Sequence, residues 1–83
     1  MMEAGYVFNN GGMRLTVIKF CTVGNRNVGL FRRESDGMYI TARNTSKGSD
    51  GTYSWAWGHY FMSYETACED YKVRLQEMLS YKS

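Results

Sequence analysis

The spacing of the apolar residues changes once along the chain, at about Ser63, and this change constrains the fold more than any other feature. Before Ser63, apolar and polar residues tend to alternate within short segments, which is the pattern of β-strands. After Ser63, apolar residues recur at intervals of three and four, as on one face of an amphipathic helix. These residues are Tyr64, Cys68, Tyr71, Leu75 and Met78. We therefore expect a sheet followed by one C-terminal helix.

The boundaries of this helix can be predicted from its end residues. Ser63 is a suitable N-cap, because a serine hydroxyl can accept a hydrogen bond from the first turn. Glu65 then places a negative charge near the positive end of the helix dipole. The periodic pattern continues to Ser80. We expect a helix over about residues 63–80.

Turn residues divide the earlier part of the chain into five expected strands. Asn9–Gly12, Gly24-Asn25 and Ser35-Asp36-Gly37 have the composition of turns, and the last of these is a strong hairpin signal. The polar, glycine-rich segment Asn44–Thr52 is typical of a mobile connection. The alternation fails near Ile18, which indicates a bulge. The expected strands cover about residues 5–8, 13–23, 27–33, 38–43 and 53–61.

The fold class that follows is α+β, an antiparallel sheet of four to five strands with one C-terminal helix packed on one face. At 83 residues the chain is expected to form one domain, residues 1–83. A domain of this size buries only about 60–65% of its unfolded surface, so it depends on large side chains. Aromatic residues make up 16% of the chain and supply that area.

Strand alternation predicts which side chains share a face of the sheet. Between residues 38 and 43, every second residue from Met38 faces one way, and those from Tyr39 face the other. In the last strand one face carries Tyr53, Trp55, Trp57, His59 and Phe61. We expect most of this aromatic face to be core beneath the helix, and the opposite face of the sheet to meet solvent or a partner. A binding platform is then expected at the start of this strand, around Tyr53 and Trp55, or at Tyr60.

The charges are unevenly distributed, although the net charge is only +2. The middle of the chain, from Arg14 to Lys47, is basic, whereas the segment from Glu65 onward is slightly acidic. This asymmetry favours an anionic partner for the middle of the chain, such as nucleic acid or an acidic protein surface. A solvated basic face without a partner is an equally good interpretation.

Catalysis is poorly supported by the sequence. His59 is the one histidine, and no spacing places it beside Cys21 or Cys68 with an orienting acid. These three residues also lack the close paired spacing of structural zinc motifs. No phosphate-binding glycine loop occurs. We expect no enzyme activity, no cofactor and no metal.

The segment from Gly29 to Arg74 resembles the DNA-binding domain of plant ethylene-response (Apetala) factors, in which three strands precede a helix. It is similarly reminiscent of the arm-DNA-binding domains of phage integrases. The matching residues are Gly29, Arg32-Arg33, Asp36-Gly37, Trp57-Gly58 and Ser63-x-Glu65-x-Ala67-x-x-x-Tyr71. The resemblance implies that the sheet face enters a DNA groove through Arg32, Arg33, Arg43 and an aromatic residue.

In general type, the chain also resembles small phage and mobile-element proteins without catalytic motifs, including anti-CRISPR inhibitors. The main hypothesis is therefore a binding protein that inhibits or modulates a host protein or nucleoprotein complex. The alternative is a DNA- or RNA-binding module, and a third hypothesis is a structural subunit that self-associates. The candidate partner-binding residues are Arg14, Arg32, Arg33, Tyr39, Arg43, Lys47, Tyr53, Trp55 and Tyr60.

The expected setting and assembly follow from what the sequence lacks. The sequence contains no run of 18 apolar residues, so no membrane-spanning helix is expected. The N-terminal residues do not have the pattern of a signal peptide. Two cysteines are too few for a disulfide framework, which favours a reducing compartment. We expect a cytoplasmic protein, in the host cell if phage-encoded, without membrane association, that is a monomer or a weak homodimer.

Overall fold

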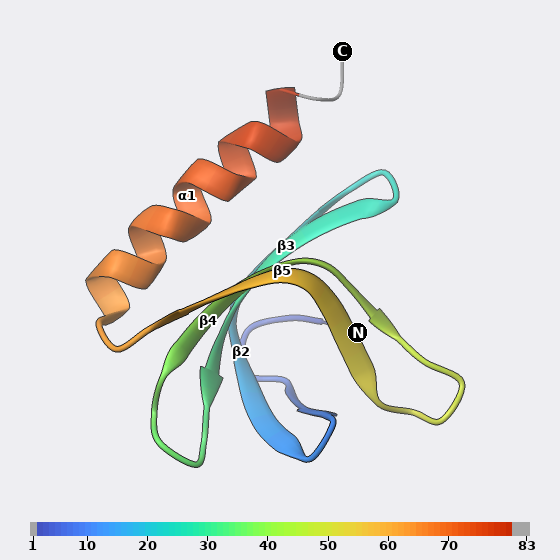
Figure 1. The fold of residues 1–83 in the computed structure, drawn as a ribbon. Coiled ribbons are helices and arrows are strands. Elements are labelled where there is room, and N and C mark those ends of the chain that lie inside the picture. The colour runs from blue at the N-terminus through green and yellow to red at the C-terminus, as the bar shows by residue number, and fades with distance from the viewer. Residues whose placement is uncertain (1, 81–83) are drawn as a thin grey trace.

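A computed structural model describes residues 2–80 as a five-stranded antiparallel sheet with one helix packed against it (Figure 1). The strands lie side by side in chain order, so each consecutive pair is a hairpin. The elements are β1 (Val7–Asn10), β2 (Met13–Val23), β3 (Arg26–Arg33), β4 (Tyr39–Lys47), β5 (Tyr53–Phe61) and α1 (Tyr64–Ser80). The α+β fold class expected from the sequence is confirmed.

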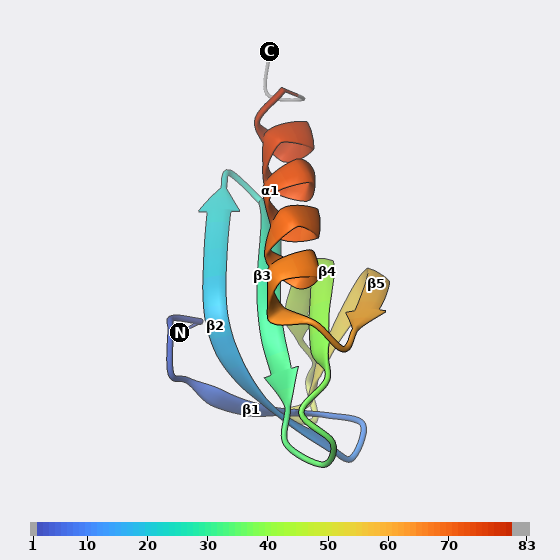
Figure 2. The ribbon, with the colours of Figure 1, turned by 90° about the vertical axis from the view of Figure 1, so that its left-hand side faces the viewer.

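The helix begins where the change of spacing predicts. The Ser63 hydroxyl accepts a hydrogen bond from the backbone N–H of Thr66 at 3.4 Å, and the Ser63 carbonyl accepts one from Ala67 at 3.1 Å. Ser63 is therefore the N-cap. The helix lies over β3 and β4 (Figure 2) and buries Ala67, Tyr71 and Met78. It also buries Arg74, which the sequence did not predict.

The bulge expected near Ile18 is confirmed. Val17 pairs with Phe31, and Lys19 pairs with the adjacent Leu30, so β2 contains one residue more than β3 at this point. A bulge of this kind increases the local twist and bend of a strand. It contributes to the strong curvature of the sheet.

The curvature brings the first and last strands of the sheet together. The Phe8 and Tyr53 rings lie 5.1 Å apart, and the hydroxyls of Tyr6 and Tyr53 are 3.5 Å apart. The sheet thus encloses a first core on the face opposite the helix. Its buried residues are Phe8, Leu15, Val17, Phe31, Ile40 and Ala42. The expectation that this face meets solvent or a partner is wrong, because β1 folds back over it.

A second core lies between the sheet and the helix. Its buried residues are Val28, Leu30, Ala67, Tyr71 and Met78, with Cys21, Cys68, Tyr39 and Phe61 packed around them. The alternation predicted for β4 is observed: Ile40 and Ala42 face the first core, whereas Tyr39 and Thr41 face the helix side. Both faces of the sheet therefore contribute core residues.

The aromatic residues of β5 do not share one face, contrary to the sequence prediction. Thr41 pairs with His59 and Arg43 pairs with Ala56, so β5 has one extra residue between these pairs. Trp57 lies in this bulge with φ 55. One extra residue reverses the facing of every later side chain in a strand. Tyr53 and Trp55 consequently pack in the first core, whereas Phe61 packs beneath the helix.

The segment after residue 43 is also more ordered than predicted. β4 continues to Lys47, whereas the sequence indicated a mobile connection from Asn44 onward. The Asn27 side chain binds the backbone of Thr45 twice, accepting from its N–H at 2.8 Å and donating to its carbonyl at 3.0 Å. These bonds replace strand pairing and hold the end of β4 against β3.

Candidate binding surface

The nine candidate residues fall in three separate places. Arg14, Arg32, Arg33, Tyr39 and Tyr60 lie at the end of the sheet where β3 leads into β4. Arg43 and Lys47 lie nearer the opposite end. Tyr53 and Trp55 pack against the first core. The structure therefore does not join the nine residues into one surface.

Arg33 is the most constrained of these arginines. Its Nη2 atom lies 2.7 Å from Asp36 Oδ2, and its Nε donates to Asp36 Oδ1 at 3.0 Å. Its guanidinium also contacts the Tyr60 ring, 5.7 Å from the ring centroid. The hydrogen bonds from Arg33 and from the Met38 N–H lower the pKa of Asp36 to about 2. The Arg33 side chain is therefore held in place by Asp36 and lies against the Tyr60 ring, so it is not a mobile surface charge.

Carboxylates also oppose two other arginines of the sheet, Arg14 and Arg43. Arg14 Nε lies 3.2 Å from Glu34, and Arg43 Nη2 lies 2.6 Å from Glu77. Arg14, Arg33 and Arg43 are therefore all ion-paired. Such pairing reduces the net positive charge that these arginines offer to a phosphate backbone.

Tyr53 and Trp55 have their rings engaged within the molecule. The Trp55 ring stacks on Phe31 at 5.6 Å with an interplanar angle of 20°, and the Tyr53 ring meets the edge of Phe8. Both side chains are only partly exposed. Their main role is to cover the first core.

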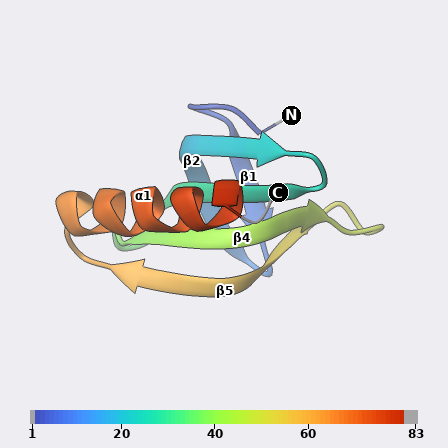
Figure 3. The ribbon, with the colours of Figure 1, turned by 90° about the horizontal axis from the view of Figure 1, so that it is seen from above.

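A different set of large side chains is exposed at the edge of the sheet. Along β5 and its connection to the helix, the exposed fractions are 74% for Trp57, 47% for Tyr60, 86% for Met62 and 43% for Tyr64. We call these four residues the rim. β5 is the last strand of the sheet (Figure 3) and pairs with β4 on its inner side. Tyr64 connects the rim to Tyr39, whose ring lies 5.4 Å away.

Local packing explains why Trp57 faces solvent. A Cβ atom at Gly58 would lie 2.7 Å from Trp55 Nε1, so only glycine allows the Trp55 indole to cover the backbone there. The adjoining bulge residue, Trp57, adopts a left-handed φ that is uncommon for a large side chain. Trp55 therefore turns inward and Trp57 outward. The sequence signal was Gly58 itself, because an isolated glycine within a strand often marks a bulge.

A polar cluster lies between the helix and β4–β5. Asp70 Oδ2 accepts a hydrogen bond from the Thr41 hydroxyl at 2.5 Å and lies 3.0 Å from His59 Nδ1. Burial raises the pKa of Asp70, but hydrogen bonds from Thr41 and His59 and the charge of Arg74 outweigh it, so that the pKa is lowered. Asp70 stands between the hydroxyl and the imidazole, so the histidine does not contact a nucleophile. This order of groups differs from that of a catalytic triad, in which the histidine lies between the carboxylate and the nucleophile.

The two cysteines and His59 do not assemble a metal site. Both thiols are free and partly buried. Among residues 2–80, no three side chains of the types that bind metals come together. Across the same residues, no helix combines the length and apolarity needed to cross a lipid bilayer.

Comparison of the chain with protein-family models, with curated proteins and with solved structures gave no significant match.

Proposed function

We propose that this chain is a non-enzymatic binding protein that docks on a partner protein through the rim. The observation that carries this proposal is the exposure of Trp57, which is itself the left-handed residue of the β5 bulge. Backbone strain of this kind persists where the surrounding structure fixes it, and it is frequent at binding sites. Exposed aromatic and methionine side chains are enriched at protein interfaces.

The position of the rim supports docking by a second mechanism. An edge strand presents backbone N–H and C=O groups on its outer side, which a partner strand can pair with. The rim places Trp57, Tyr60 and Met62 along or just beyond this strand. A partner with an apolar pocket and an accessible strand edge matches both features. Arg33, beside Tyr60, adds one positive charge partly balanced by Asp36.

The finer assignment within this proposal is a small inhibitor or modulator of phage or mobile-element type, acting on a host protein or nucleoprotein complex. It rests on the likeness in general type described above and on the arrangement of the polar groups. Thr41 is fully buried and donates its hydroxyl proton to Asp70, so it is not available as a nucleophile. The surface that remains is suited to binding rather than to chemistry.

The test is a capture experiment with three immobilised proteins: the natural chain, Trp57→Gly and Val73→Ser. Trp57→Gly removes the exposed indole and suits the left-handed backbone, so the fold is expected to persist. Val73 is a matched control, because it is also an exposed apolar residue but lies on the helix, away from the rim. We expect a host protein that binds the natural chain and Val73→Ser, and binds Trp57→Gly at least about tenfold more weakly.

Two outcomes contradict the proposal. The first is a partner that binds Trp57→Gly as well as it binds the natural chain. The second is capture of nucleic acid alone, with an affinity that falls steeply as salt is raised, which identifies a phosphate-binding module instead. Circular dichroism of Trp57→Gly must first show an intact fold.

A further inference from the structure

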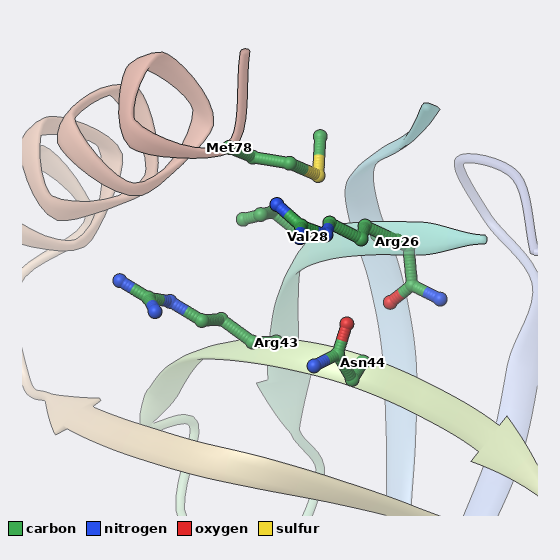
Figure 4. Close-up of a pocket in the computed structure, with 6 residues that line it drawn as sticks. Arg26, Val28, Arg43, Asn44 and Met78 are labelled. Atoms are coloured by element: carbon green, nitrogen blue, oxygen red, sulfur yellow. The ribbon is translucent and has the colours of Figure 1, made fainter. Parts of the chain in front are cut away.

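A pocket of about 260 Å³ opens at the end of the molecule opposite the β3–β4 hairpin. It lies between the start of β3, the middle of β4 and the last turn of the helix (Figure 4). Its lining residues are Arg26, Asn27, Val28, Arg43, Asn44 and Met78. None of the rim residues contributes to it, so it is a separate site.

The divergence of two strands creates this pocket. Regular pairing of β3 with β4 ends at Val28 and Arg43. Beyond that pair, the Asn27 side chain rather than its backbone holds β4, through its two bonds to Thr45. Asn44 adopts φ 53 within a bulge of β4. Because of this bulge, the consecutive residues Arg43 and Asn44 both line the pocket, which an unbroken strand would not allow.

The lining combines positive charge with an apolar wall. The side chains of Arg26 and Arg43 extend from neighbouring strands on the side of the sheet that Met78 covers (Figure 4). Arg43 forms an ion pair with Glu77, but this pair is partly exposed to solvent and leaves most of the guanidinium donors of Arg43 for another acceptor. The Asn44 amide adds a neutral polar group, whereas Val28 and Met78 are apolar.

A buried arginine beside the pocket increases the positive charge. Arg74 lies one helical turn before Met78 on the same buried face of the helix, and its side chain is 4% exposed. Its Nε atom is 3.4 Å from Asp70, yet neither Nε nor Nη1 makes a hydrogen bond. Burial lowers the pKa of Arg74, and the nearby Arg43 cation lowers it further. Arg43 and Arg74, paired with Glu77 and Asp70 respectively, thus bring two guanidinium groups to this side of the pocket.

We propose that this pocket binds the phosphate monoester group of a small ligand. Arginine is suited to this group because its planar donors match phosphate oxygens in pairs. Arg26 and Arg43 hold the phosphate from two strands, and the Asn44 amide contributes a further donor. Val28 and Met78 contact the part of the ligand next to the phosphate. The volume accommodates a phosphate with a small adjoining group rather than an extended polymer.

The experiment is a titration of the ¹⁵N-labelled protein, followed by NMR, with three probes: inorganic phosphate, adenosine 5′-monophosphate and adenosine. We expect both phosphate-containing probes to shift the amide signals of Val28, Asn44 and Met78, and adenosine to leave them unchanged. The monophosphate should bind more tightly than inorganic phosphate because of the apolar wall. If neither phosphate probe shifts these signals at tens of millimolar, the proposal is wrong.

Variants of the pocket should change the affinity for the monophosphate in opposite directions, which a purely structural role of these residues would not produce. Arg43→Gln should weaken binding of the monophosphate by about 10- to 100-fold, as expected for loss of a charge-assisted bond. Arg26→Gln is a second variant for the same test. Glu77→Gln should instead strengthen binding severalfold, because it removes the carboxylate that competes for Arg43. Arg14→Gln is the matched control, an ion-paired arginine outside the pocket.

The remaining outcomes decide the chemical source of the phosphate. Equal weakening by Arg14→Gln and Arg43→Gln indicates nonspecific charge attraction and contradicts a built site. A single-stranded oligonucleotide without a terminal phosphate that competes as well as the monophosphate also overturns the proposal, in favour of backbone binding. A 5′-phosphorylated oligonucleotide that competes only through its terminal phosphate supports it.

Discussion

The two faces of the sheet are packed in different ways. The first core, enclosed by the curled sheet, is filled by aliphatic and aromatic side chains from all five strands. The second core, beneath the helix, contains a buried arginine and adjoins the polar cluster of Thr41, His59 and Asp70. The difference shows that the core within the curled sheet is packed with apolar groups, whereas the helix side accommodates polar groups that need hydrogen-bonding or charged partners.

This difference is related to where the candidate sites lie. The pocket opens beside the helix, near Arg74 and Met78, on the polar side of the molecule. The rim lies at the border between the two cores, at the bulge where β5 changes its facing side chains. Neither site lies within the first core. We infer that the first core provides the rigidity on which both surfaces depend.

The largest effect is expected from Phe31→Ala in the first core. Phe31 is fully buried, and its ring contacts those of Phe8 and Trp55 at 5.0 and 5.6 Å. Its loss should lower the free energy of unfolding by about 3–5 kcal/mol. Tyr71→Ala in the second core should cost less, within about 2–4 kcal/mol, because Tyr71 is less completely buried than Phe31. Urea denaturation measures both, and a larger loss for Tyr71→Ala would reverse the comparison.

Gly29→Ala should have the next largest effect, again through the first core. A Cβ atom at this position would lie 2.4 Å from Phe31 Cζ and 3.0 Å from Phe20 Cδ1. Because Phe31 is fully buried, its ring cannot move aside without disturbing its neighbours. We expect a loss of about 1–3 kcal/mol in the free energy of unfolding. Gly48→Ala is the control, since its nearest neighbour is the exposed Asp50 side chain, and an equal loss there would exclude overpacking as the cause.

Arg74→Met tests the polar character of the second core. The guanidinium of Arg74 is buried with two nitrogen atoms that lack hydrogen bonds. Replacing a poorly paired buried charge with an apolar side chain of similar length often leaves stability unchanged or raises it. We expect the free energy of unfolding to stay level or to rise by up to about 1 kcal/mol. Thermal unfolding that shows a loss of more than about 2 kcal/mol would mean that Arg74 is a structural necessity.

The sequence predicted the local features of the fold and missed those that depend on long-range packing. The change of apolar spacing, the Ser63 cap and the bulge near Ile18 are local and are confirmed. Closure of β1 over β5 depends on the curvature of the whole sheet, which alternation within one strand does not show. The order of Asn44–Lys47 depends on the side chain of Asn27, 18 residues before Thr45.

The candidate sites were predicted less well, for the same physical reason. A single extra residue at Trp57 places Tyr53 and Trp55 in the first core and moves the exposed aromatic surface toward Met62. Arg26 and Asn44 were not among the predicted residues, because their proximity arises only where β3 and β4 separate. Arg43 and Tyr60 were predicted, and the structure places them in the pocket and the rim respectively.

The smallest expected effect is a difference between the two faces of the sheet in how acid changes their local stability. The folded-state pKa of Asp70 lies below its ordinary value of 3.8. Its contribution to stability is therefore complete above about pH 4 and is lost as the pH falls through the lower, folded-state value. Because Asp70 lies on the helix side, amide hydrogen exchange should accelerate first in the helix, by less than about tenfold, before the centre of β3 changes. The Asp36→Asn variant, used throughout, removes the separate titration of Asp36 near pH 2. Acceleration that begins in β3 would contradict the assignment of the acid-sensitive contacts to the helix side.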